Sequence, residues 1–180
     1  MIFQSPKAII DIFQYIALKH KSIGKYTDGR PAFFFGEKFE MNNQYDQISP
    51  MLYLRFSQEL RYRPQTVEAY FTMMILSKFE ETPADAQTDK TLEYLKYQEI
   101  SACEKIGQSI IMQLYTALPK ANTGISLIED GGMLARGVTV EDLFGNAFVG
   151  VSYDLGFKGT PDRLCVDMFD SDFNLKTICP

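Results

Sequence analysis

The chain has 180 residues, of which 46% are hydrophobic and 23% charged, and its formal net charge is -5 at pH 7. This composition is that of a globular protein, and the net charge with no basic cluster argues against a nucleic-acid-binding protein, because phosphate contacts need clustered Lys and Arg. No apolar run reaches the ~20 residues that a membrane-spanning helix needs, so we expect a soluble chain made in the cytoplasm.

An N-terminal helix of about four turns is predicted from Pro6 onward. Ser5 is a capping residue before a proline that suits a first helical turn, and apolar residues then recur at helical spacing. These apolar residues are Ile9, Ile12, Phe13, Ile16 and Ala17. Residues 32–35 follow as a short apolar strand, and residues 37–49 are mostly polar and predict a loop.

Residues 50–79 predict a β-hairpin, because two runs of alternating apolar residues flank the break at Arg63, Pro64 and Gln65. One face of the first run carries Leu52, Leu54, Phe56, Leu60 and Tyr62, and one face of the second carries Val67, Ala69, Phe71, Met73, Ile75 and Phe79. The second face is not cleanly polar, because it also contains Tyr70, Met74 and Leu76. We therefore expect a helix of the chain or another subunit to cover that face.

A polar linker separates the hairpin from a long helix that is predicted over residues 92–118 and stopped by Pro119. Its expected buried stripe comprises Leu92, Leu95, Cys103, Ile106, Ile110, Leu114 and Ala117. Residues 125–128 and 133–140 predict two short strands around a turn at Gly131 and Gly132. Residues 146–157 alternate strictly and predict a half-buried strand, in which Gly150 and Gly156 indicate close approach of another chain segment.

These elements predict a single α+β domain over residues 1–158 and an acidic, aromatic extension over residues 159–180. The expected sheet is mixed, mainly antiparallel and about four to five strands wide, with the long helix packed on one face and the shorter N-terminal helix beside it.

No pattern in the sequence predicts catalytic, cofactor-binding or metal-binding residues. Cys103, Cys165 and Cys179 are widely separated, and His20 is the only histidine. His20 could act as a base, but its place between two lysines at a helix end indicates an exposed or capping imidazole. Three aspartates, Asp167, Asp170 and Asp172, lack the spacing of a calcium loop and favour a solvated tail. We therefore expect a protein that acts through its surfaces and is not an enzyme.

The order of elements resembles that of the tail terminator, or tail-completion, proteins of long-tailed bacteriophages. The segments that carry the resemblance are the N-terminal helix up to residues 26–32, the hairpin, the long helix and residues 143–153. The resemblance implies a homo-oligomer, hexameric in that family, that caps the tail tube as a ring and joins it to the head-side connector in the neck of the virion. Residues 37–49 and the part after Lys158 depart from the family pattern.

A ring made by joining sheets needs an open edge strand and apolar surface. We therefore expect an interface at exposed sheet residues and in the C-terminal extension, namely at Tyr70, Met74, Leu76, Phe148, Phe169 and Phe173. Two other classes of protein remain open. One is an acidic chaperone or protein-binding module that forms a dimer, and the other is a ligand-binding domain or enzyme with a pocket between the long helix and the sheet.

Overall fold

A computed structural model describes residues 6–36, 48–63, 66–79, 92–120, 124–142 and 148–159. Within these ranges the protein is α+β, with two helices and one mixed sheet in which only β1 and β2 are parallel. The helices are α1 (Pro6–Lys19) and α3 (Leu92–Lys120), and the strands are β1 (Phe33–Phe35), β2 (Met51–Arg63), β3 (Thr66–Lys78), β4 (Ile125–Leu127), β5 (Arg136–Asp142) and β6 (Phe148–Gly159). The predicted fold class is confirmed, but the predicted sheet of four to five strands is too narrow.

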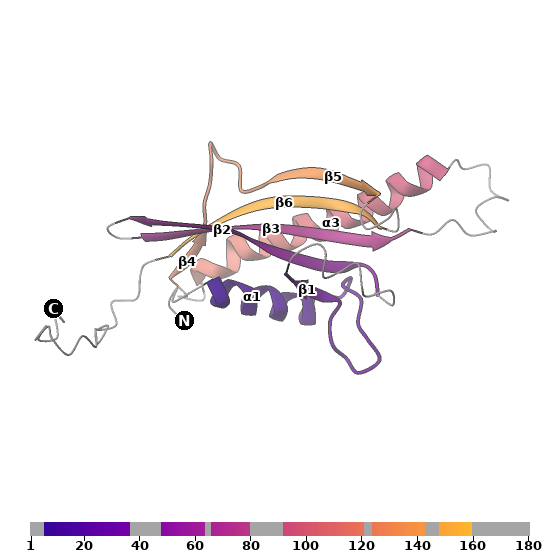
Figure 1. Cartoon of the computed structure of the whole chain (residues 1–180), viewed down its shortest axis with the longest axis horizontal. Coiled ribbons are helices and arrows are strands. Elements are labelled where there is room, and N and C mark those ends of the chain that lie inside the picture. The colour runs from indigo at the N-terminus through magenta and orange to yellow at the C-terminus, as the bar shows by residue number, and fades with distance from the viewer. Residues whose placement is uncertain are drawn as a thin grey trace, which may run out of the picture.

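The sheet order is β1-β2-β3-β6-β4, and β5 pairs with the same edge of β6 as β4 does. Figure 1 shows β2, β3, β6 and β5 lying side by side as the long strands. The predicted hairpin is confirmed, with β2 and β3 paired from Met51↔Leu76 to Arg63↔Thr66 and an irregularity between Phe56 and Leu60. Both three-residue strands, β1 and β4, were predicted as short segments at residues 32–35 and 125–128, but the expected width of the sheet did not count them both.

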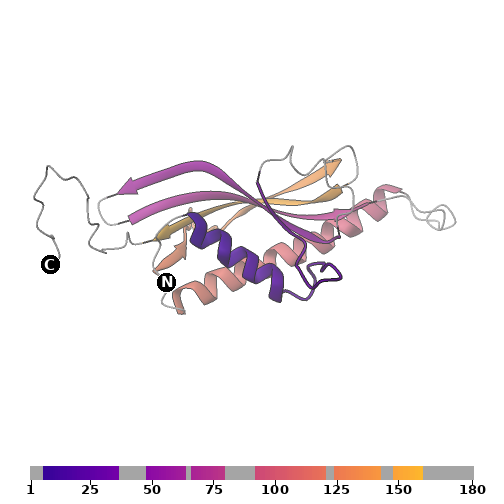
Figure 2. The ribbon, with the colours of Figure 1, turned by 60° about the horizontal axis from the view of Figure 1, so that its bottom comes forward.

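Both helices pack on one face of the sheet, which we call the helix-covered face (Figure 2). The ring of Phe13 of α1 meets Phe157 of β6 edge-on at 5.9 Å, and Phe157 meets Phe71 of β3 in the same way. The hydroxyl of Tyr153 donates a hydrogen bond to the carbonyl of Glu104 in α3. Phe71, Tyr153 and Phe157 share this face because side chains alternate along a strand and cross-strand partners point the same way. The predicted core positions on β3 are therefore confirmed.

The opposite face carries Tyr70, Thr72 and Met74 of β3, and neither described helix packs on it. The favoured expectation that a helix of the chain covers this face is wrong for α1 and α3. At the β1 end of this face Phe34 stacks on Tyr53, its cross-strand partner, whose hydroxyl donates to the carbonyl of Gly36. Tyr53 is in turn the cross-strand partner of Met74, so the three residues form one row across the sheet.

Helix α3 runs for 29 residues and buries one stripe against the sheet. The buried residues are Ile100, Cys103, Ile106, Gly107, Ile110, Ile111, Leu114 and Leu118. The prediction was correct for the middle of the stripe and wrong at both ends, where Leu92 and Ala117 are exposed. Leu92 lies in the first turn of α3, well before Glu99, which accepts a hydrogen bond from Ser77 of β3. Leu118 replaces Ala117 because it lies closer to the line of Ile110 and Leu114.

Candidate interaction surface

Three of the sheet residues predicted to be exposed are instead buried in the single chain. Met74 is 6% exposed, Leu76 0% and Phe148 8%, and Tyr70 is half-buried with its hydroxyl donating to Glu68. An exposed interface at these positions was the wrong prediction, because alternation shows which side chains share a face and not what covers that face. Phe169 and Phe173 lie outside the described residues.

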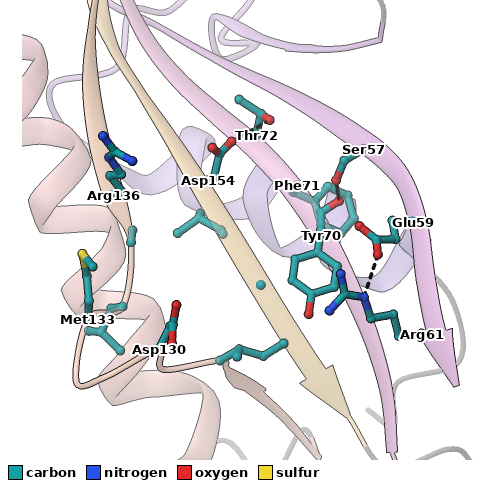
Figure 3. A pocket seen from close by; sticks show the side chains of 15 residues that line it. Ser57, Glu59, Arg61, Tyr70, Phe71, Thr72, Asp130, Met133, Arg136 and Asp154 are labelled. Atoms are coloured by element: carbon teal, nitrogen blue, oxygen red, sulfur yellow. Dashed lines mark hydrogen bonds and ion pairs between the residues drawn. The ribbon is translucent and has the colours of Figure 1, made fainter. Parts of the chain in front are cut away.

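The opposite face holds a cavity of about 510 Å³ between the sheet and the segment that links β4 to β5 (Figure 3). The split between these two strands creates it. Leu127 of β4 pairs with Phe157 and Arg136 of β5 pairs with Asp154, so after a last hydrogen bond from the Ile128 N–H to the Gly156 carbonyl, residues 129–135 leave the ladder. The predicted turn at Gly131 and Gly132 is confirmed, since both have positive φ angles and Asp130 and Met133 exchange backbone hydrogen bonds.

Gly156 lies at the floor of the cavity, with the side chains of Ile128 and Tyr70 close to its Cα atom. A Cβ atom on Gly156 would lie 3.0 Å from Cδ1 of Ile128 and 3.2 Å from Cε1 of Tyr70. The absence of a side chain at Gly156 therefore lets Ile128 and Tyr70 pack closely over β6. This agrees with the close approach that the sequence predicts at Gly156.

Charged side chains surround this cavity, and most are already paired. Arg61 forms an ion pair with Glu59 at 2.6 Å and lies over the ring of Tyr70, which is visible in Figure 3. Thr72 donates a hydrogen bond to Asp154 at 3.0 Å across the β3–β6 pair.

Burial raises the pKa of Tyr70, and its hydrogen bond to Glu68 adds to this effect. The lining includes two aliphatic hydroxyls, that of Ser57, which donates to the Tyr70 carbonyl, and that of Thr72, which donates to Asp154, and none of its residues is a histidine. These residues are suited to binding a polar group.

A second cavity, of about 480 Å³, lies on the helix-covered face between α3 and β5. Gln108, Ile111 and Met112 line it from the helix, and Gly137 and Thr139 line it from β5. Tyr153 lies at its base, and burial raises the pKa of this phenol to about 12, with Glu104 and Cys103 acting in the same direction. A pocket between the long helix and the sheet was the feature expected for a ligand-binding domain.

The outer edge of β5 is one of two open edges of the sheet in the described ranges. β5 pairs with β6 on one side, and no described strand pairs with its other side. All residues from Arg136 to Thr139 are exposed, and Val138 is 53% exposed. The sequence predicted a strand here but gave no signal that it forms an edge, because strand order depends on contacts between distant segments.

His20 lies apart from both cavities, and its Nδ1 accepts a hydrogen bond from the backbone N–H of Ser22 at 3.2 Å. Partial burial lowers its pKa. Within the described ranges no group of three or more His, Cys, Asp or Glu side chains is placed to hold a metal ion. The three aspartates of the C-terminal part lie outside those ranges.

No protein-family model matches the chain, and no curated protein matches it. Neither α1 nor α3, the helices that the structure describes, combines the length and apolar character needed to cross a membrane.

Proposed function

We propose that this protein is a structural assembly protein of a phage or phage-derived tail, which forms a ring, caps the tail tube and joins it to the head-side connector. The observation that carries the proposal is the open outer edge of β5 on a sheet whose opposite face has neither described helix on it. A sheet of this kind can continue into a neighbouring copy through backbone hydrogen bonds. The order of helix, hairpin, long helix and closing strand is the further support.

Net charge is compatible with this role. A chain with a formal net charge of -5 repels DNA, so a ring of such chains would let DNA pass without binding it strongly. The proposed partners are further copies of the chain, the tail tube and the connector, and the proposed location is the neck of the virion.

Light scattering tests self-association, and sedimentation with purified tail tubes tests the role. We expect a closed oligomer, hexameric by the resemblance, that co-sediments with tube ends. A wild-type chain that stays unassembled and does not bind tubes would contradict the proposal.

A small-ligand-binding domain is the second candidate, and the cavity of about 510 Å³ on the opposite face favours it. Its volume falls in the range of ligand sites, and Arg61, Asp154 and Tyr70 offer polar contacts beside an apolar wall. A monomer whose melting temperature rises with small anionic or aromatic compounds would favour this candidate over the ring.

A further inference from the structure

The open edge of β5 can accept one more strand. Its inner side is paired with β6 from Arg136↔Asp154 to Val140↔Gly150, and its outer side has no partner strand in the described part of the chain. An exposed strand edge with unpaired backbone groups is a template for strand addition.

The other open edge, that of β2 beyond Leu54, has features that oppose strand addition. Arg55, Glu59 and Arg61 put charges along it, and its register is irregular between Phe56 and Leu60. Natural sheets use charges and bulges of this kind to protect edges. β5 carries charges only at its ends, at Arg136, Glu141 and Asp142, and its pairing with β6 is regular from Arg136 to Val140. The two edges therefore differ, and β5 is the one suited to accept a strand.

The cavity between α3 and β5 indicates which kind of side chain an added strand should carry opposite Gly137. Gly137 has no side chain, and the ring of Tyr153 lies directly over it, since a Cβ atom on Gly137 would be 3.0 Å from Cε1 of Tyr153. An apolar side chain on an added strand, opposite Gly137, would pack against this ring and against Met112, which lines the same cavity.

We propose that residues 164–170 of a second copy of this chain add to the outer edge of β5 as an antiparallel strand. The inferred register places Asp170 opposite Arg136, which takes part in no ion pair or hydrogen bond shown among the described residues. The apolar pairs on the same face are Met168 with Val138 and Val166 with Val140. Cross-strand pairs of these types stabilise a sheet.

The same register places Phe169 opposite Gly137, on the face with the cavity of about 480 Å³. Alternation directs Phe169 to the helix-covered face when Met168 and Asp170 point to the opposite face. A single register thus pairs Asp170 with Arg136, Met168 with Val138 and Phe169 with the cavity that Gly137 and Tyr153 line. A parallel strand would instead bring Asp170 towards Glu141, which has the same charge.

The donor is a second copy because the chain's own segment is too short to reach. In this register Val166 stands beside Val140, whose partner on β6 is Gly150. β6 rises ~30 Å between Gly150 and Gly159 at ~3.3 Å per residue. The stretch from Gly159 to Val166 spans at most ~25 Å when fully extended.

This inference rests on the proposed function in that both require self-association. The donated segment and the β5 edge are different surfaces, so the contact is heterologous and can close into a ring. The outer edge of β5 is then the surface that binds residues 164–170 of the neighbouring copy.

A disulfide tests the register in the full-length chain. Cys165 would stand opposite Glu141, at a separation that a disulfide can bridge. Glu141→Cys in a Cys179→Ser background should give covalently linked multimers on mild oxidation, with peptide mapping that joins positions 141 and 165. Val140→Cys is the matched control, because its side chain points to the other face, and it should give at least tenfold less linked product. Removing Cys165 by Cys165→Ser should abolish the link.

The outcomes separate this inference from the proposed function. An oligomer that forms but gives no 141–165 link overturns the inference and leaves the ring intact. Linked pairs that stop at two copies support strand donation, since each copy receives the segment of the other, but contradict the ring. A linked ladder that extends beyond two copies supports both, and a chain that stays monomeric and unlinked overturns both.

Discussion

Gly107 of α3 lies against the ring of Tyr153 of β6, so closely that a Cβ atom on Gly107 would overlap the ring. The hydroxyl of Tyr153 donates to the Glu104 carbonyl one helical turn earlier. The helix can therefore approach the sheet only because position 107 has no side chain. This contact sets the position of α3 beside β5.

Gly107→Ala should destabilise the protein by about 1–3 kcal/mol, because forced overlap in a packed core outweighs the ~1 kcal/mol by which alanine favours a helix. Urea unfolding monitored by circular dichroism would measure the change. Ser101→Ala, at an exposed position of the same helix, is the control and should change stability by less than ~0.5 kcal/mol. A neutral Gly107→Ala would show that α3 does not approach Tyr153 this closely.

Phe71→Ala should cost about 3–5 kcal/mol, because Phe71 is fully buried and its ring contacts those of Phe56 and Phe157. Tyr62→Ala is the comparison on the same hairpin, since Tyr62 is 75% exposed and should tolerate the change. Equal losses of melting temperature for both variants would refute the assigned burial, with Phe71 in the core and Tyr62 exposed.

Alkaline pH should destabilise the fold through Tyr153. Its pKa is raised to about 12 in the folded protein, so the native state holds this proton more tightly than the unfolded chain, where a tyrosine titrates near 10. The associated stability is present below pH ~10 and is lost as pH rises from there to about 12. Tyr153→Phe should show a smaller loss of urea midpoint over this range. Part of the loss should remain, because the pKa of the Cys103 thiol is also raised to about 12 by burial and by Glu99.

The buried side of β3 and the side of α3 that faces the sheet could both be predicted from the sequence. The alternation of Phe71, Met73 and Ile75 identified the buried side of β3, and the spacing of Cys103, Ile106 and Ile110 identified the face of α3 that meets the sheet. Both patterns are local, and burial of one face imposes them directly.

The interface residues could not be predicted in the same way. Met74 and Phe148 fall on strand faces that also carry polar residues, such as Thr72 and Ser152, yet both are buried. Tyr53, the cross-strand partner of Met74, stacks on Phe34, and a neighbour from so distant a segment cannot be predicted from local alternation. Aspartate at Met74 or Phe148 should therefore damage the fold itself, because it would bury a charge. The sequence likewise did not predict that β5 has an open edge, because this depends on which strands pair with β6.

Val138→Lys should weaken self-association by at least tenfold while leaving the melting temperature within a few degrees of the wild type. Val138 is 53% exposed, so a lysine costs the single chain little, and a charge in the middle of an edge strand opposes pairing. Tyr62→Lys is the matched control, because Tyr62 is also exposed but lies on the β2 edge. Sedimentation velocity over a concentration series would measure both variants. If Tyr62→Lys dissociates the oligomer and Val138→Lys does not, the β2 edge forms the contact instead.

The mass of the full-length chain in solution, measured by multi-angle light scattering after size-exclusion chromatography, tests the central claim most directly. The claim is that the protein works as a self-assembled ring held through its open sheet edge. It predicts one discrete oligomer of several copies, hexameric by the resemblance, whose mass stays constant across a tenfold dilution. A monomer of 20.6 kDa at every concentration would contradict it.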